Sequence, residues 1–330
     1  MNNPQISVIM PAYNAEKYIA EAINSILSQT FNDFEFIIIN DASTDSTKEI
    51  IESYKDLRIK LINNERNQGV AKSLNIGLAA ARGKYIARMD ADDISLPQRF
   101  QTQFDFMEQN PDIGICGSWA QNFGNRDDVI KTYQTHKEIK DVTFFYCALI
   151  HPTVFFRNDI ALFYPEDFTS AQDYNLWSRT VDTIKLANIP KVLLLYRRHS
   201  EQTNGKKQND VANDIRLKNV KKIGVDLSEE ERSIYLDIVN GIFIAKNKIE
   251  LISAVKILDN ISTAGTAHGY KQLFQDKIRN FIKNIAEHSL QNKITSPKLY
   301  FTTFRKWKIF ETPRANLRYI YYCFRNLLHL

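Results

Sequence analysis

The chain has 330 residues, of which 44% are hydrophobic and 25% are charged. This is the composition of an ordinary globular protein and excludes wholesale disorder, while 11 glycines and 9 prolines are too few for a collagen-like or linker-rich chain. The three cysteines, Cys116, Cys147 and Cys323, are too few and too far apart for a disulfide framework or a zinc cluster, which is typical of a reducing compartment.

The net charge of +5 is unevenly distributed along the chain. Residues 291–330 carry eight Lys or Arg and one acid, Glu311, a net charge of +7, whereas residues 1–290 carry a net charge of −2. A polyanionic surface would therefore be bound by the C-terminal segment and not by the body of the protein.

No segment of the sequence has the pattern of a membrane span. The longest apolar runs, such as 192–196, hold about five residues, against the roughly 20 that a spanning helix needs. No Lys or Arg precedes Lys17 and no long apolar stretch follows the N-terminus, so a secretory signal is not expected. We therefore expect a cytoplasmic protein.

Apolar runs and amphipathic segments alternate over the first 120 residues. Strands are predicted at 6–10, 34–39, 59–62, 84–89 and 113–117. Helices are predicted between them, the first after Asn14 as a candidate N-cap, the next over about 43–54 and 67–81, and another from 97. This alternation predicts βαβ units and an α/β fold with a mainly parallel sheet.

The rest of the chain changes character twice. Residues 120–200 are mixed, with strands predicted at 153–157 and 192–197 and a helix near 173–181. From about residue 209 the pattern is helical, with few Gly or Pro. We place a domain boundary near Gly205, inside a polar stretch.

Polar clusters follow three of the predicted strands, at 12–14, 40–45 and 90–93. In parallel sheets, ligands bind beyond the carboxyl ends of the strands. The last cluster holds Asp90, Asp92 and Asp93, whose carboxylates repel one another unless a cation lies among them. Such oxygen ligands suit Mg²⁺ or Mn²⁺ shared with substrate phosphates. The alternative is a solvated turn whose aspartates cap the next helix.

Asp41 and Asp45 belong to the second cluster. A carboxylate at this position can accept a hydrogen bond from a nucleobase or from a ribose hydroxyl. We favour ligand contact for Asp41 and helix capping for Asp45, because Asp is a preferred capping residue.

Several motifs occur in a fixed order over about the first 200 residues. They are 7–14, 40–45, 67–69, Lys72, Asn75, Gly77, 83–85, 90–93, 171–177 and 195–203. Together they resemble the family 2 glycosyltransferases of the GT-A fold. Three positions depart from that pattern: Asn40 stands where an acid is usual, Ala42 where a glycine is usual, and Gln172 where a glutamate is frequent.

The resemblance implies an overall organisation and a reaction. A GT-A catalytic domain would cover residues 1–204, with a nucleotide-sugar half of about 1–120 and an acceptor half of about 121–204, and a helical region would follow over 205–330. The reaction would be an inverting transfer of sugar from a nucleotide-sugar donor, a UDP-hexose or UDP-N-acetylhexosamine. The acceptor would be a hydroxyl of a cell-surface glycan such as lipooligosaccharide, O-antigen or capsule, free or lipid-linked.

The resemblance also implies roles for single residues. Asp173 would be the catalytic base, and Asp92 and His199 would bind Mn²⁺ or Mg²⁺. The implied donor-binding residues are Pro11, Ala12, Tyr13, Asp41, Lys72, Asp90 and Arg198. The alternatives are that Asp173 caps its helix and that His199 is a surface histidine.

The basic C-terminal segment is amphipathic over 314–328, with Arg314, Arg318 and Arg325 beside the apolar face. Residues 291–330 could bind an anionic membrane surface, which would make the protein peripheral on the inner face of the cell membrane. The same pattern also fits a terminal helix that docks on the catalytic domain, with its cations in water. No nucleic-acid recognition motif accompanies the charge, so no nucleic-acid partner is expected.

Two other functions use some of the same residues. A nucleotidyltransferase also combines paired aspartates with a divalent metal on an α/β sheet, and a non-catalytic sugar-binding protein could use the metal without turnover. Neither explains Asp173 together with the segment 195–199.

Overall fold

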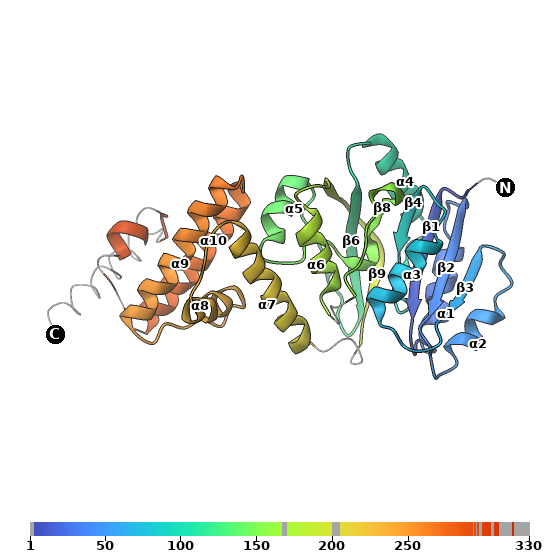
Figure 1. The fold of residues 1–330 in the computed structure, drawn as a ribbon, viewed down its shortest axis with the longest axis horizontal. Helices are drawn as coiled ribbons and strands as arrows, with labels where there is room; N and C mark the ends of the chain where they lie inside the picture. Colours follow the sequence, from blue (N-terminus) through green and yellow to red (C-terminus); the bar gives the residue numbers. More distant parts are fainter. Residues whose placement is uncertain are drawn as a thin grey trace. The chain divides into compact units, whose positions relative to one another are not determined.

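The computed structural model describes residues 3–166, 170–199, 205–292, 294, 296, 299–304, 307–309 and 319. The chain divides into two compact units, Met1–Ala212 and Asn213–Leu330, which Figure 1 shows in sequence colours.

The first unit is built on one sheet, in which the described residues form nine strands. The strands are β1 (Ile6–Ala12), β2 (Phe34–Asn40), β3 (Ile59–Asn63), β4 (Tyr85–Arg88), β5 (Ile94–Ser95), β6 (Ile115–Gly124), β7 (Val129–Ile130), β8 (Phe155–Arg157) and β9 (Leu186–Arg198). Their order across the sheet is β3-β2-β1-β4-β8-β6-β9-β5, with β7 beside β6.

The direction of the strands differs between the two halves of this sheet. β1, β2, β3 and β4 run parallel to one another. β8 is antiparallel to both β4 and β6, and β5 is antiparallel to β9, whereas β6 and β9 are parallel. The predicted α/β class is confirmed, and the sheet is parallel in its first half and mixed in its second.

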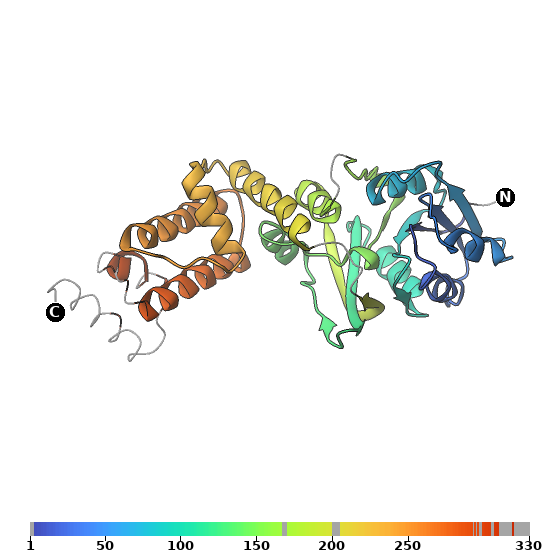
Figure 2. The same cartoon turned by 90° about the horizontal axis from the view of Figure 1, so that it is seen from below.

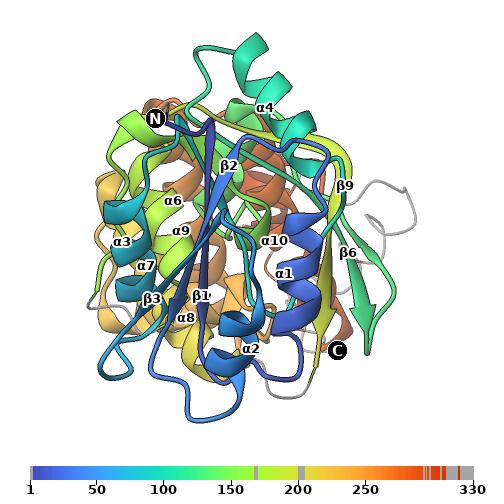
Figure 3. The same ribbon diagram turned by 90° about the vertical axis from the view of Figure 1, so that its right-hand side faces the viewer.

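The two central strands of the parallel half are buried on both faces. Every residue of β1 and of β2 is buried, as the continuous apolar runs in the sequence indicate. Ile6, Val8 and Met10 belong to the same core cluster as the buried side of α1 (Ile19–Leu27). On the other face α3 (Val70–Ala80) approaches so closely that a Cβ at Gly77 would lie 2.4 Å from Ile9 Cγ2. Figure 3 shows α3 on one side of these strands and α1 and α2 (Thr47–Ser53) on the other.

Asn14 does not cap the first helix. That helix begins at Ile19, and Asn14 has a positive φ of 49°. Its side-chain oxygen accepts a hydrogen bond from the Thr44 backbone N–H at 2.9 Å. Asn14 therefore joins the loop after β1 to the loop after β2, a contact between distant residues that no local pattern indicates.

The remaining helices of the first unit are α4 (Arg99–Gln109), α5 (His136–Thr143) and α6 (Gln172–Thr180), with short 3₁₀ turns at His151–Thr153 and Asn158–Ile160. The core cluster includes Phe100 and Met107 of α4. The helix predicted from residue 97 is present and begins at Arg99.

A buried carboxylate fastens the amino ends of the strands. Glu35, which is 4% exposed, accepts hydrogen bonds from Ser7 Oγ (2.7 Å), Lys60 Nζ (2.7 Å) and the Arg82 backbone N–H (2.8 Å). Burial raises the pKa of Glu35, but the bonds from Lys60, Ser7 and Arg82 outweigh it and hold the pKa at about 2.

Glu35→Gln is therefore expected to destabilise the fold by about 2 kcal/mol at neutral pH, since hydrogen bonds to charged groups contribute roughly 1.5–3 kcal/mol each. The folded-state pKa lies below the ordinary value, so the stabilisation is present above the ordinary pKa and is lost as the pH falls towards about 2. Thermal melting at neutral pH and at about pH 3 measures this loss of stability. The difference in melting temperature between the wild type and Glu35→Gln should be smaller at about pH 3. Glu52→Gln, which removes an exposed pair with Lys48, is the control; a gap that widens in acid would contradict the assignment.

The second unit is helical. α7 (Gly205–Lys222) leads into it, and α8 (Glu229–Val239), α9 (Lys248–Ala267) and α10 (Gln272–Gln291) form its body, which Figure 2 shows from a second direction. Ser228 and Glu231 form a capping box at the start of α8. α9 and α10 pack so closely that a Cβ at Gly265 would lie 2.4 Å from a ring carbon of Phe274. None of the described helices combines the length and apolarity needed to cross a membrane.

Parts of the basic C-terminal segment dock on this helical unit. Phe304 and Tyr319 are buried and their rings pack at 5.3 Å. Trp307 Nε1 donates to Asp259 Oδ1 of α9 at 3.4 Å, and Arg279 of α10 donates to the Lys308 carbonyl at 3.1 Å. These contacts attach the described residues of 299–304 and 307–309 to the helical unit, whereas the predicted alternative was docking of the terminal helix on the catalytic domain. The amphipathic stretch 314–328 lies, apart from Tyr319, outside the described residues, so its membrane role stays a prediction.

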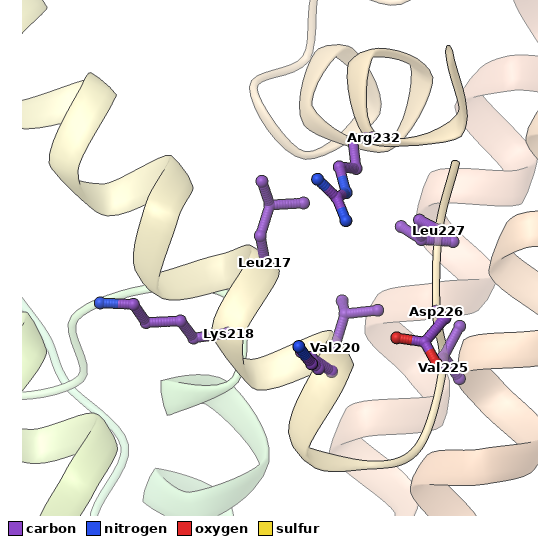
Figure 4. Close-up of a pocket in the computed structure, with 8 residues that line it drawn as sticks. Leu217, Lys218, Val220, Val225, Asp226, Leu227 and Arg232 are labelled. Atoms are coloured by element: carbon purple, nitrogen blue, oxygen red, sulfur yellow. The ribbon is translucent and has the colours of Figure 1, made fainter. Parts of the chain in front are cut away.

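A small cavity of about 150 Å³ lies between α7 and α8. Its walls are mostly apolar, with Leu217, Val220 and Leu227 facing Arg232, as Figure 4 shows. It contains none of the predicted site residues and is smaller than the roughly 300 Å³ at which ordinary ligand pockets begin. We assign it no function.

Candidate active site

Three parallel strands end at one edge of the sheet. The Asp41 N–H donates to the Ala12 carbonyl at 2.8 Å, directly beyond β1 and β2. The Met89 N–H donates to the Ile9 carbonyl at 3.0 Å, which brings the residues after β4 to the same edge. The predicted donor-binding residues at the carboxyl ends of β1, β2 and β4 therefore lie at the same edge of the sheet. Pro11 and Ala12 are buried there, and Tyr13 is 49% exposed.

Asp41 holds the loop that starts α3. It is 3% exposed, and its carboxylate accepts hydrogen bonds from Asn64 Nδ2 (2.7 Å), the Gln68 N–H (2.9 Å) and the Gly69 N–H (2.8 Å). The sequence pattern gave no sign of this anchoring. The predicted contact of Asp41 with a nucleobase stays a prediction, as does that of Lys72, which lies half-buried in the first turn of α3.

Asp45 bonds to the first turn of α2. Its Oδ1 accepts from the Thr47 backbone N–H at 3.0 Å and from the Thr47 hydroxyl at 2.6 Å, and its Oδ2 accepts from the Glu16 N–H at 3.0 Å. Burial raises the pKa of Asp45, but these bonds outweigh it and lower the pKa overall. The capping interpretation of Asp45 agrees with this geometry.

The three carboxylates after β4 converge. Asp90, Asp92 and Asp93 each place a carboxylate oxygen within 4.8 Å of the others. Asp93 is 1% exposed; its Oδ1 accepts from the Arg197 N–H at 2.8 Å, whereas its Oδ2 is buried and has no partner among the described residues. A buried carboxylate oxygen without a partner is unusual and costly. Hard oxygen donors in this arrangement fit Mg²⁺ or Mn²⁺.

The electrostatics of the cluster point the same way. Burial, followed by the charges of Asp90 and Asp92, raises the pKa of Asp93 well above its usual value. Burial and Asp92 also raise the pKa of Asp90, although the buried Arg88 guanidinium, which forms an ion pair with it, opposes the shift. A divalent cation would relieve this repulsion.

His199 lies against the same cluster. Its Nε2 is 3.0 Å from Asp92 Oδ2, and its ring packs 5.1 Å from that of Tyr18. β5 and β9 pair antiparallel, with Ile94 opposite Leu195, so the residues before β5 meet the residues at the end of β9. The structure thus brings together the two predicted metal ligands, which are more than a hundred positions apart in the sequence.

Arg198 is held on the other side of its strand. Its Nε donates to Asn122 Oδ1 of β6 at 2.8 Å, and its guanidinium lies 4.4 Å from the ring centroid of Tyr196. Its predicted contact with the donor stays a prediction.

Asp173 lies in the first turn of α6, close to the acidic cluster. Its Oδ1 accepts from the Tyr174 N–H at 2.8 Å, and its Oδ2 accepts from the Cys147 thiol at 3.4 Å. Burial raises the pKa of Asp90, the charge of Arg88 lowers it, and the charge of Asp92 raises it. The charge of Asp173 makes a smaller contribution that also raises it. The charge of the candidate base thus acts on the candidate metal site, while the bond to the Tyr174 N–H gives Asp173 a local role in the helix.

Sequence reasoning gave no role to Tyr164, which is 1% exposed. Its hydroxyl lies 2.9 Å from His151 Nε2, and Asn75 of α3 holds its backbone through both the N–H (2.9 Å) and the carbonyl (2.8 Å). Burial raises the pKa of Tyr164; Arg88 opposes this, and Asp173 and Asp90 add to it. The charges of both carboxylates thus act on its phenol. Only Asn75, one of the quoted motif residues, could have pointed to this contact.

The Glycosyl transferase family 2 model matches residues 7–169. An uncharacterized glycosyltransferase of Haemophilus influenzae is 38% identical over 250 residues, which is 68% of this chain and 77% of that protein. The UDP-Glc:alpha-D-GlcNAc-diphosphoundecaprenol beta-1,3-glucosyltransferase WfaP of Escherichia coli is 31% identical over 241 residues, 72% of this chain and 94% of that protein. The chain belongs to glycosyltransferase family 2 and is a glycosyltransferase, which decides against the nucleotidyltransferase and non-catalytic alternatives.

A solved structure supports the fold assignment. The crystal structure of S. aureus TarS in complex with UDP-GlcNAc resembles this chain with a TM-score of 0.56 over 98% of this chain and 92% of that chain, at 20% identity. At this level of identity the likeness shows the fold alone. The predicted GT-A fold is confirmed.

Proposed function

We propose that this glycosyltransferase moves a sugar from a UDP-hexose or UDP-N-acetylhexosamine to a hydroxyl of a lipid-linked cell-surface glycan. The observation that carries the proposal is the convergence of Asp90, Asp92 and Asp93 with His199 beyond the sheet edge. The charge of Asp173 acts on this cluster, where it helps to raise the pKa of Asp90. The name of WfaP, with its UDP-Glc donor and diphosphoundecaprenol acceptor, supports the choice of donor and acceptor class. TarS in complex with UDP-GlcNAc supports the donor class.

Asp92 and His199 are the proposed ligands of Mn²⁺ or Mg²⁺, with the unpartnered Oδ2 of Asp93 as a further ligand. When bound, the cation supplies Lewis-acid stabilisation of the charge on the leaving diphosphate. Asp90 is the proposed contact to the ribose side of the donor. Its ion pair with Arg88 holds its carboxylate in place.

Asp173 is the proposed general base. It removes the proton of the acceptor hydroxyl while that oxygen attacks the anomeric carbon from the face opposite the nucleotide. The new bond joins the acceptor oxygen to the anomeric carbon, the bond to the diphosphate oxygen breaks, and the proton stays on Asp173. The bonds from Tyr174 and Cys147 orient the carboxylate for this step.

The donor pocket in this proposal begins at the ends of β1 and β2. Pro11, Ala12 and Tyr13 line the pocket of the nucleobase, and Asp41 contacts the nucleobase. Lys72 and Arg198 contact the rest of the donor.

The proposed catalytic domain covers residues 1–204, with the donor half over about 1–120 and the acceptor half over about 121–204. A peripheral position on the inner face of the cell membrane, through residues 291–330, belongs to the same proposal.

A panel of nucleotide sugars tests the donor class. The purified full chain is incubated with Mn²⁺ and UDP-, GDP-, ADP- and dTDP-sugars, and the released nucleotide is measured. We expect release from one or more UDP-sugars and little from the others. Turnover confined to a GDP- or dTDP-sugar would contradict the donor assignment.

A further inference from the structure

Arg197, near the end of β9, has a guanidinium group that lies against two aromatic rings. Its central carbon lies 4.4 Å from the ring centroid of Tyr18 and 4.4 Å from that of Phe123, well inside the roughly 6 Å range of cation–π attraction. The side chain is 14% exposed. A planar group packed against two rings has restricted freedom to turn, so its N–H groups keep a narrow range of directions.

The edge of this guanidinium meets the acidic loop. Nε donates to the main-chain carbonyl of Asp92 at 2.7 Å, and Nη2 pairs with Glu21 Oε2 at 2.6 Å. The backbone N–H of Arg197 donates to Asp93 Oδ1 at 2.8 Å. One residue thus holds two of the three acidic positions, Asp92 through its main chain and Asp93 through its carboxylate.

These contacts determine which oxygens of the loop are left for a ligand. Because Arg197 occupies Asp93 Oδ1, it is Oδ2 that has no partner among the residues the structure describes. Because the Asp92 main chain is fixed by Nε, its carboxylate can lie against His199 without the loop having to move. Carboxylates that repel one another need such a scaffold to converge.

We propose that Arg197 is a positioning residue for the metal site, which sets the main chain at Asp92 and the carboxylate at Asp93 so that their ligand oxygens converge. The inference rests on the proposed function, because it requires the cluster to bind a cation. Arg197 acts through the acidic loop and needs no contact with the sugar nucleotide. Arg198, whose Nε is bonded to Asn122, has no part in this arrangement.

The test is Mn²⁺ binding by the full chain with UDP present, followed through loss of the electron paramagnetic resonance signal of free Mn²⁺. Arg197→Met keeps the backbone N–H that bonds Asp93 Oδ1 but loses the Nε bond to the Asp92 carbonyl. It is expected to weaken Mn²⁺ binding by about 10–100-fold, the usual effect of removing a group that orients metal ligands. Arg197→Lys keeps the charge but loses the planar fork, so its loss should be smaller. Excess Mn²⁺ should restore turnover of Arg197→Lys, which loss of folded protein would not allow.

Two variants serve as controls. Glu21→Gln removes only the ion pair of Arg197 with a 57% exposed partner, and exposed pairs contribute about 0–1 kcal/mol, so Mn²⁺ affinity should change by less than about fivefold. Arg126→Met removes an arginine from an exposed pair with Asp128 and should leave Mn²⁺ affinity unchanged.

Asp92→Ala separates this inference from the proposed function. If Asp92→Ala binds Mn²⁺ as the wild type does, the metal site itself is wrongly assigned. If Asp92→Ala loses Mn²⁺ while the Arg197 variants bind it normally, the inference about Arg197 is overturned and the metal site stands. Should Arg197→Met fail to fold, the Mn²⁺ affinity of Arg197→Lys and its rescue by excess Mn²⁺ decide the question.

Discussion

Asp92→Ala should reduce sugar transfer by about 10³-fold or more, because a metal ion contributes several kcal/mol of stabilisation to the charge on the leaving group. The variant removes the carboxylate that lies 3.0 Å from His199 and belongs to the acidic cluster. The loss is measured from initial rates with Mn²⁺ and a UDP-sugar that the wild type uses as donor. Asp105→Ala, at an exposed position of α4, should retain full activity.

Chelation provides a second readout of the same claim. Excess EDTA should abolish turnover of the wild type, and added Mn²⁺ should restore it. Because Asp92 is half-buried and lies in a repulsive cluster, its loss should not lower the melting temperature greatly. Full wild-type activity in EDTA would contradict the metal assignment.

Asp173→Asn should lower kcat by about 10²–10⁴-fold, the usual range for loss of a general base. Asparagine keeps the side-chain oxygen that accepts from the Tyr174 N–H, so α6 should still begin where it does. Nucleotide affinity, measured by calorimetry with UDP and Mn²⁺, should change little.

Asp159→Asn, at an exposed position of a 3₁₀ turn, is the matched control and should behave as the wild type does. Near-normal turnover of Asp173→Asn would show that Asp173 serves only the first turn of α6. The capping alternative would then be correct, and the base would have to be sought elsewhere at this sheet edge.

The parts of the fold that could be predicted from the sequence are those with a strong local pattern. The apolar runs of β1 and β2 identify strands buried on both faces, and the polar residues after them mark the ligand edge. β5 and β7 have two residues each, too few for any periodicity, so they were missed. The mixed direction of the second half was missed for another reason. A strand was predicted at 153–157, but an apolar run does not show that this strand, β8, is antiparallel to β4 and β6.

The residues of the candidate site also fall into those that the sequence indicated and those that only the structure brings together. The acidic cluster is a local motif, and the pairing of His199 with Asp92 was predicted through the family resemblance. The anchoring role of Asp41, the place of Tyr164 and the contacts of Arg197 come from residues that are 13 to 176 positions apart. Such contacts depend on the register of paired strands and on helix packing, and one sequence without its structure does not reveal them.

The stereochemistry of the transferred sugar tests the central claim most directly. Proton nuclear magnetic resonance, recorded early in the reaction with an α-linked UDP-sugar, shows the anomeric configuration of the new glycoside or of the hydrolysed sugar. A single displacement assisted by Asp173 predicts the β anomer as the first product. An α-configured first product would contradict the proposed mechanism at this site.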